Sequence, residues 1–295
     1  MPAASLPPLV LATRRSPLAL RQAELARAAL SAVPSAPWNR VDLLELTTTG
    51  DRQRDWSLAD QGGKGLFTRE LEDAVLDNRA HLAVHSAKDL PTTLPHGLVL
   101  AGFLPRADPR DVLVRRADVA VPRTVATGSP RRRAQAPCAC PSWGRHPQWL
   151  ELRGNVDTRL KKIAAGEADA TFLAAAGLDR LGLSAFPGLV FEPLPIDKMI
   201  PAAGQGAIAL ECREADAPLF APFLCAATAR AVFLERIILA ALGGGCQNAS
   251  AVHFAAGVLH VFHESRRAAF PDTPVAGEPN IADLVVRVCA WSASL

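Results

Sequence analysis

Two junctions, in which a short apolar run leads through a polar turn into Ser-Pro, constrain the fold of this chain more than any other feature. In the first, residues 9–12 (Leu-Val-Leu-Ala) precede Ser16 and Pro17; in the second, a run ending at Ala126 precedes Ser129 and Pro130. Serine at the N-cap and proline at the first helical position are typical of helix starts. Each junction therefore predicts a buried strand, a turn and a helix.

Similar patterns elsewhere predict further strands and helices, and their alternation indicates parallel βαβ units. Residues 136–149 contain three prolines and predict an irregular loop, whereas residues 251–262 predict a strand or hairpin. Further strands are predicted at 41–46, 81–86, 98–104, 150–152 and 170–173, and helices at 18–28, 67–76, 217–242 and 281–288.

The length of 295 residues predicts two or three domains. Hydrophobic residues make up 49% of the chain and charged residues 21%, which is typical of a globular protein and excludes a disordered one. The formal net charge of +3 argues against nonspecific nucleic-acid binding, but it allows a local basic cleft for an acidic small molecule.

Missing sequence patterns predict the cellular compartment and the role of the cysteines. No apolar run reaches the ~18–20 residues of a membrane span, and residues 1–8 lack the basic-then-apolar pattern of a signal peptide. The sequence therefore predicts a cytoplasmic protein with reduced thiols. Of six cysteines only Cys138 and Cys140 lie close together, whereas a structural zinc site normally takes four ligands from two such pairs. We therefore expect no metal.

Ionisable side chains gather where the predicted strands end. Arg14 and Ser16 stand between a strand and a helix, where open α/β sheets bind ligands and helix N-termini favour anions. The strand predicted at 81–86 leads directly to Lys88 and Asp89. Such a cluster favours a functional role, and a carboxylate there suits proton transfer or the holding of positive charge. Ordinary solvated charges are the alternative at both places.

Three arginines follow Pro130 in the first turn of a predicted helix, a position where they oppose the helix macrodipole. This placement predicts an anion that compensates them; a solvated basic helix end is the alternative. Arg153 stands at the tip of the next predicted strand, where Gly154 and Asn155 form a turn and a helix carrying Arg159 follows.

Two glycine-rich stretches predict loops. Residues 61–65 contain three glycines and Lys64 and lead to Phe67; their spacing is not that of a P-loop, and they predict mobility or close approach to a ligand. Residues 243–245 are all glycine and precede Cys246. Such a loop presents the thiol, and the alternative is a buried, inert cysteine.

Taken together, these stretches resemble the porphobilinogen deaminase (hydroxymethylbilane synthase) family. The resemblance runs from about Leu11 to Gln247, and the matching segments follow the family's order. The chain departs from the family pattern at Gly128, at 136–149 and at 248–251. The segments that carry the resemblance are 12–20 (ATRRSPLAL), 62–67 (GGKGLF), 84–91 (VHSAKDLP), 152–160 (LRGNVDTRL), 201–207 (PAAGQGA) and 244–247 (GGCQ).

The resemblance implies an α/β fold with two lobes like those of type II periplasmic binding proteins, an active cleft between them, and a small α+β C-terminal domain. Lobe 1 would comprise residues 1–104 and 200–219, lobe 2 residues 105–199, and the C-terminal domain residues 220–295. It implies a transferase of porphyrin (haem) biosynthesis that condenses four porphobilinogen molecules into linear hydroxymethylbilane and releases ammonia. It also implies one covalent dipyrromethane cofactor per chain, linked to Cys246 by a thioether.

By the same resemblance Asp89 is the catalytic residue, which would hydrogen-bond pyrrole N–H groups, assist loss of the amino group and stabilise a cationic intermediate. Arginines suit the acetate and propionate arms of porphobilinogen because they bind carboxylates bidentately. The implied cofactor contacts, besides the cysteine, are Ser86, Lys88, Thr127, Ser129, Arg131, Arg132, Arg153 and Gly154. The implied substrate contacts are Arg14, Ser16, Lys64, Phe67, Arg159 and Arg180.

The resemblance further implies a cytoplasmic monomer with no nucleic-acid or membrane partner, and a product hand-off to uroporphyrinogen-III synthase. Two other functions compete with it. A noncatalytic two-lobed protein that binds a small polycarboxylate would leave Asp89 and Cys246 without a role. A transferase with a cysteine nucleophile would need a base near that thiol, and His253, His260 and His263 are the available ones.

Overall fold

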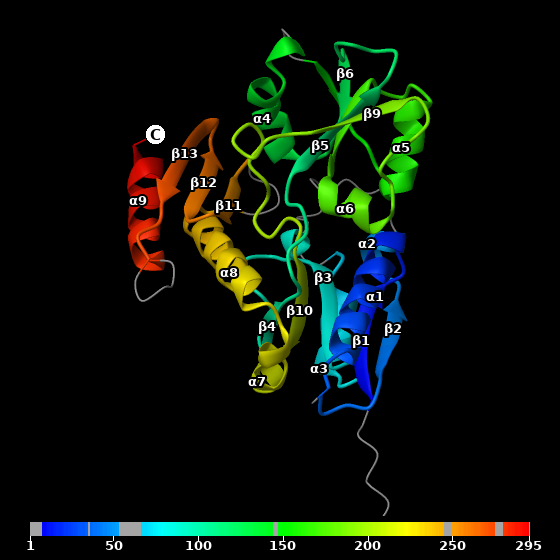
Figure 1. Ribbon diagram of the computed structural model, residues 1–295, viewed down its shortest axis with the longest axis vertical. Coiled ribbons are helices and arrows are strands. Elements are labelled where there is room, and N and C mark those ends of the chain that lie inside the picture. Colours follow the sequence, from blue (N-terminus) through cyan, green and yellow to red (C-terminus); the bar gives the residue numbers. More distant parts are fainter. Residues whose placement is uncertain are drawn as a thin grey trace, which may run out of the picture. The chain divides into compact units, whose positions relative to one another are not determined.

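The computed structural model of the chain describes residues 8–34, 36–52, 66–143, 147–244, 249–274 and 280–294. The chain forms two compact units. Figure 1 labels most of their helices and strands. The predicted boundaries, which separate residues 220–295 as a third domain, stay a prediction. Unit 1 comprises Met1–Arg106 and Ala207–Ala229, and unit 2 comprises Ala107–Gly206 and Arg230–Leu295.

The described part of unit 1 is built on a five-stranded mixed sheet. In spatial order its strands are β2 (Val41–Leu46), β1 (Leu9–Arg14), β3 (Leu82–Ser86), β10 (Ile208–Arg213) and β4 (Leu98–Phe103). The prediction of parallel strands is confirmed for β1, β2 and β3. It is wrong for β10, which is antiparallel to both neighbours, because this strand comes from a distant segment rather than from a crossover helix.

Helices cover both faces of this sheet because its strands are apolar on both sides. In unit 1 the helices are α1 (Pro17–Ser31), α2 (Thr49–Arg52), α3 (Arg69–Leu76) and α7 (Ala217–Phe220), with 3-10 turns η1 (Ala87–Asp89), η3 (Glu214–Asp216) and η4 (Ala221–Phe223). Leu11 and Val84 pack on the side of α1, whereas Ala12 and Ala83 pack on the side of α3. Successive strand residues thus serve two separate cores.

Unit 2 contains a second five-stranded sheet among its described residues. Its strands, in spatial order, are β7 (Gln148–Leu150), β6 (Thr124–Ala126), β8 (Ala170–Ala174), β5 (Asp111–Arg116) and β9 (Leu189–Pro193). β6 is parallel to β7 and β8, whereas β5 is antiparallel to β8 and β9. The strand predicted at 150–152 lies at 148–150 instead, and no sequence pattern predicts β9.

The helices of this sheet are α4 (Pro130–Ala139), α5 (Val156–Ala164) and α6 (Ala175–Arg180), with a 3-10 turn η2 (Pro141–Trp143). The prediction of an irregular loop from residue 136 onward is wrong for the end of α4. Pro137 lies in the last turn of that helix, where its missing N–H removes a single backbone bond, and Cys140 N still donates to Ala136 O at 2.8 Å.

A three-stranded antiparallel sheet in the C-terminal part of unit 2 packs with two helices. These elements are β11 (Ala251–Ala255), β12 (Val258–His263), β13 (Arg266–Pro271), α8 (Ala226–Ala241) and α9 (Ile281–Ala293). Leu234 of α8 and Leu284 of α9 share a core with Val252 and Val261. The predicted hairpin is confirmed. β13 is not predicted, because it opens with two arginines and lacks an apolar alternation.

Within the described ranges, no helix combines the length and the apolar character that crossing a membrane requires. The same residues contain no group of three or more histidine, cysteine, aspartate or glutamate side chains arranged to hold a metal ion.

Candidate active site

Unit 1 gathers polar side chains at the edge of its sheet where β1, β2 and β3 end. These strands are parallel, so their carboxyl ends meet at one edge, and Arg14, Leu46 and Ser86 are their last residues. Ser16 caps α1 directly after β1, and its Oγ accepts a hydrogen bond from Ala19 N at 3.3 Å. The structure therefore places the predicted residues Arg14, Ser16 and Ser86 at the same edge.

The side chain of Arg14 has two partners at this edge. Its Nε and Nη2 donate to Asp51 Oδ2 and Oδ1 at 3.2 and 2.5 Å, and its Cζ lies 4.3 Å from the centroid of the Phe67 ring. Burial alone would raise the pKa of Asp51, but hydrogen bonds from Arg14 and Thr48 outweigh it and lower that pKa. The structure thus brings together the predicted residues Arg14 and Phe67 and adds Asp51, which no motif marks.

The turn η1, which carries Lys88 and Asp89, follows β3 at this edge. Ser86 Oγ accepts a hydrogen bond from Gln22 Nε2 at 2.8 Å, which ties the end of the strand to α1. Lys88 is half-buried and Asp89 is exposed. Among the described residues, none forms a hydrogen bond or an ion pair with the Asp89 carboxylate, so it can accept hydrogen bonds from a ligand.

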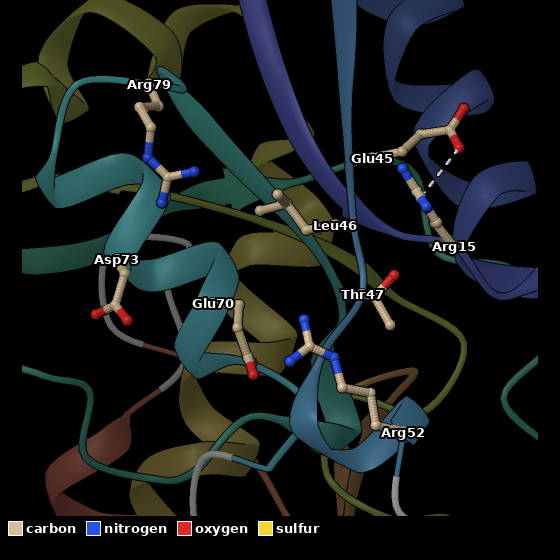
Figure 2. A pocket seen from close by; sticks show the side chains of 8 residues that line it. All are labelled: Arg15, Glu45, Leu46, Thr47, Arg52, Glu70, Asp73 and Arg79. Carbon is tan, nitrogen blue, oxygen red and sulfur yellow. Dashed lines mark ion pairs between the residues drawn. The ribbon is translucent and has the colours of Figure 1, made fainter.

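A pocket of about 320 Å³ lies at the end of β2 (Figure 2). Arg15 Nε lies 4.0 Å from Glu45 Oε2, and Glu70 Oε1 accepts hydrogen bonds from Thr49 N and Oγ1 at 2.7 and 2.6 Å. Guanidinium and carboxyl groups are equal in number here, so the pocket lacks the excess positive charge that a polycarboxylate requires. It includes none of the predicted site residues. Its lining is Arg15, Glu45, Leu46, Thr47, Arg52, Glu70, Asp73 and Arg79.

In unit 2, two predicted hydroxyl residues organise the start of α4. Thr127 is buried, and its Oγ1 accepts a hydrogen bond from Ser129 N at 3.2 Å. Ser129 is the N-cap, and its Oγ accepts from Arg132 N at 3.4 Å. A Cβ atom at Gly128 would lie 3.0 Å from Glu151 Oε2, the end of an exposed side chain that can move aside, so packing does not require glycine at this departure from the family pattern.

Arg131 and Arg132 are buried and share one carboxylate. Asp111, fully buried at the start of β5, places Oδ2 2.7 Å from Arg131 Nη1 and Oδ1 2.7 Å from Arg132 Nη2. The two Nη1 atoms also donate to Ile200 O and Phe172 O, each at 2.7 Å. The anion predicted to compensate this helix start is therefore supplied by the protein. The role of both arginines toward a cofactor stays a prediction.

The turn between β7 and α5 holds three predicted residues together. Arg153 is 36% exposed, and its Nη2 lies 3.9 Å from Glu151 Oε2, so its guanidinium can take a further acceptor. Gly154 has φ +110°, and a Cβ atom there would lie 2.7 Å from Thr158 Cγ2, so the turn requires glycine. Arg159 Nε donates to Gly154 O at 2.8 Å.

Arg180, at the end of α6, is bound to the backbone of its own unit. Its Nη2 donates to Gly206 O at 2.6 Å, and burial lowers its pKa. Lys64 and Cys246 lie outside the described residues. The other predicted site residues lie within the described ranges. They therefore form one group in unit 1, at the edge that carries Asp89, and a second group in unit 2.

Comparison with known proteins decides the family. The family model described as "porphobilinogen deaminase, dipyromethane cofactor binding domain" matches residues 9–221. This chain belongs to the porphobilinogen deaminase family. The porphobilinogen deaminase of Sphingopyxis alaskensis is 44% identical to it over 257 residues, which cover 83% of this chain and 79% of that protein.

Similar solved structures are distant. The periplasmic VFT2 domain of BvgS from Bordetella pertussis has a TM-score of 0.44 at 16% identity, with 74% of this chain and 87% of that chain covered. An ABC transporter protein from Parabacteroides distasonis has a TM-score of 0.44 at 12% identity, with 78% and 73% covered. At these values the likeness carries no argument about function.

Membership of the porphobilinogen deaminase family confirms the predicted fold, an α/β protein with two lobes of the type II periplasmic-binding-protein kind, and it confirms the predicted activity. The chain is a transferase of porphyrin biosynthesis that condenses porphobilinogen stepwise into hydroxymethylbilane on a dipyrromethane cofactor.

The described residues of unit 2 fit a cofactor that carries carboxylate arms. Arg153 has its nearest ion-pair partner 3.9 Å away, and the N-terminus of α4 favours anions. The hydroxyl of Ser129 stands at that N-terminus. The donor set is therefore cationic and rich in hydrogen-bond donors, as porphobilinogen deaminase chemistry requires.

Proposed function

We propose that Asp89 is the catalytic residue of this porphobilinogen deaminase and that the cofactor is attached to Cys246 by a thioether. The observation that carries the first part is the Asp89 carboxylate, which is exposed and without a partner among the described residues. It would accept hydrogen bonds from pyrrole N–H groups of porphobilinogen. It would also stabilise the positive charge that develops on the substrate as the amino group leaves as ammonia.

The carboxylate arms of the pyrroles are assigned to the cationic residues at the strand ends. When bound, the cofactor supplies the primer to which porphobilinogen units are added. Arg153, Arg131 and Arg132, with Ser86, Lys88, Thr127, Ser129 and Gly154, would hold that primer. Arg14, Ser16, Lys64, Phe67, Arg159 and Arg180 would bind the incoming substrate. Arg14 supports this assignment best, because its guanidinium is half-buried and already oriented by a bidentate carboxylate contact.

We also infer a cytoplasmic monomer that binds no nucleic acid and no membrane and passes its product to uroporphyrinogen-III synthase. The modest net charge of +3 supports the absence of nucleic-acid binding, and the family resemblance supports the rest. The lobes 1–104 with 200–219 and 105–199, and a C-terminal domain 220–295, remain the proposed domain organisation. Sedimentation of the purified protein tests the oligomeric state.

The attachment and the catalytic residue are tested together. The intact mass of the purified protein should exceed the sequence mass by two pyrrole units, and Cys246→Ala should remove this addition while Cys138→Ala, which changes an exposed cysteine, keeps it. Asp89→Asn should bind the cofactor and fold normally but lose nearly all turnover. Asp42→Asn, which changes a half-exposed aspartate of β2 paired with Arg40, should retain it.

Each outcome has a distinct meaning. An addition that persists in Cys246→Ala would refute the attachment site. Full turnover in Asp89→Asn would remove the catalytic role of that residue. A protein that carries no addition, makes no bilane and still binds a polycarboxylate would favour the noncatalytic binding protein instead.

A further inference from the structure

A buried group of ionisable side chains lies under the strand that leads to Asp89. His85 Nε2 in β3 lies 3.0 Å from Glu211 Oε2 in β10, and the two side chains are 4% and 0% exposed. In the register of these antiparallel strands, Glu211 lies opposite Ala83 and His85 lies opposite Ala209. Ala83 packs on the side of α3, so both ionisable side chains point to the face that α3 covers.

α3 adds a second carboxyl group to this pair. Glu72 is buried. Burial raises the pKa of Glu72, and the Glu211 carboxylate raises it further, while Thr68 and His85 act in the opposite direction. The group thus consists of a buried hydrogen bond between His85 and Glu211 and a second buried carboxyl group, that of Glu72, on α3.

The same strand end is held from a second side. His85 is fixed by Glu211 from β10, and the next residue, Ser86, is fixed by Gln22 from α1. Asp89 follows three residues later, at the end of η1. The carboxylate is itself exposed and unpartnered among the described residues, so its position depends on the backbone that these contacts hold.

We propose that His85 and Glu211 are positioning residues that set where the Asp89 carboxylate lies. The proposal rests on the catalytic role proposed above for Asp89. Leaving either member of a buried hydrogen-bonded pair without its partner in the interior is unfavourable, so the His85 side chain and the backbone that bears it keep one arrangement. In reactions that depend on placed charge, a displacement of about 1 Å costs roughly 100-fold in rate.

The test uses cofactor-loaded enzyme, with loading checked by intact mass. The variants are Glu211→Gln, His85→Asn and their combination. The matched control is His81→Asn, because His81 precedes the opposite end of the same strand and its Nδ1 accepts from Val10 N at 3.0 Å. For each protein, kcat and KM for porphobilinogen and the thermal unfolding midpoint are measured.

We expect both single variants to lower kcat by roughly 10- to 100-fold, with KM changed less than about threefold. The double variant should be no slower than the slower single one, since the two residues act as a unit. His81→Asn should lose stability and keep its kcat. If the pair were purely structural, its variants would instead have a lower folded fraction, and the kcat of the folded enzyme would be unchanged.

Several results would overturn the proposal: an equal loss of kcat in His81→Asn, additive losses in the double variant, or unchanged kcat in both single variants. Failure of both single variants to fold, with His81→Asn folded, would assign the pair to stability and overturn it as well. Asp89→Asn separates the two proposals. If it turns over normally, the catalytic assignment fails; if it is inactive while the pair variants keep kcat, only the positioning role fails.

Discussion

The two five-stranded sheets have the same pattern of strand directions, but they place charge differently at corresponding positions. In each, three parallel strands lie side by side, and an antiparallel strand comes next in the sheet, β10 in unit 1 and β5 in unit 2. At the start of that strand unit 1 has Ile208, opposite Ser86, whereas unit 2 has Asp111, opposite Ala174. The first is a buried apolar residue and the second a buried carboxylate.

The helices that follow the corresponding strands β1 and β6 show the same contrast between apolar and charged residues. α1 begins with Pro-Leu-Ala after its serine cap, and α4 begins with Pro-Arg-Arg after its own. In unit 1 Ile208 belongs to the apolar core, whereas in unit 2 Asp111 binds Arg131 and Arg132. One sheet edge is thus held by hydrophobic contact and the other by a buried ionic group. The same pattern of strand directions is compatible with either.

Breaking the ionic group should have the largest effect. Asp111→Asn removes the negative charge that two buried guanidinium groups share and should lower the free energy of unfolding by about 3–5 kcal/mol. Asp51→Asn removes the half-buried partner of Arg14 in unit 1 and should lower the free energy of unfolding less, by about 1 kcal/mol. Urea unfolding of both variants at neutral pH measures the contrast.

A second variant sharpens that comparison. Asp111→Ile, Arg131→Leu and Arg132→Ala together give unit 2 the apolar pattern of unit 1. Replacing a whole buried ionic group is often neutral or stabilising, so this protein should unfold within about 2 kcal/mol of the wild type. It should nevertheless lack the mass of the cofactor if the arginines bind it. A triple variant as unstable as Asp111→Asn would show that the edge of unit 2 requires charge.

Local patterns account for the parts of the fold that the sequence predicts. The two Ser-Pro junctions combine an apolar run with a cap, and the structure has a strand and a helix at each. The antiparallel placement of β5 and β10 is not predictable in this way, because it depends on pairing with strands far along the chain. β9 and β13 carry no alternation to mark them. α4 continues through Pro137 to Ala139, although local propensity predicts that the helix ends before this proline.

The same limit applies to the site. The motif residues, such as Arg14, Ser129 and Asp89, stand at strand ends because strand, turn and helix follow one another in sequence. Their charge partners do not follow from local pattern. Asp111 follows a proline-punctuated connection, and Glu211 is 126 residues from His85. Such partners are set by which strands meet in space, and only the folded chain specifies this.

The two serine caps test whether the shared junction contributes equally in both units. Ser16 and Ser129 each accept one hydrogen bond from the helix start, at 3.3 and 3.4 Å. Ser16→Ala and Ser129→Ala should therefore each lower the free energy of unfolding of the cofactor-free protein by about 1 kcal/mol. Ser31→Ala, at the exposed end of α1, should change it by less than about 0.5 kcal/mol. Clearly unequal losses at the two caps would show that the junctions are not equivalent.

The smallest effect is expected for Glu72→Gln, and its sign depends on pH. Burial raises the pKa of Glu72 above its ordinary value of 4.5, so the folded protein holds a proton there that the unfolded chain has lost. The stability from this proton is fully present below pH 4.5 and is lost as the pH rises through the folded-state pKa. Gln cannot lose it. In urea unfolding across this range, the free energy of unfolding of the variant should therefore rise relative to that of the wild type as the pH rises.

Asp51 provides the opposite case within the same unit. Its pKa is lowered, so its contribution is present above its ordinary value of 3.8 and is lost as the pH falls through the folded-state pKa. Asp51→Asn should thus cost most at neutral pH and least in acid. If the cost of Glu72→Gln also grew as the pH rises, the pKa of Glu72 would be lowered in the folded protein, as that of Asp51 is. Burial under α3 would then not be the dominant influence on this carboxyl group.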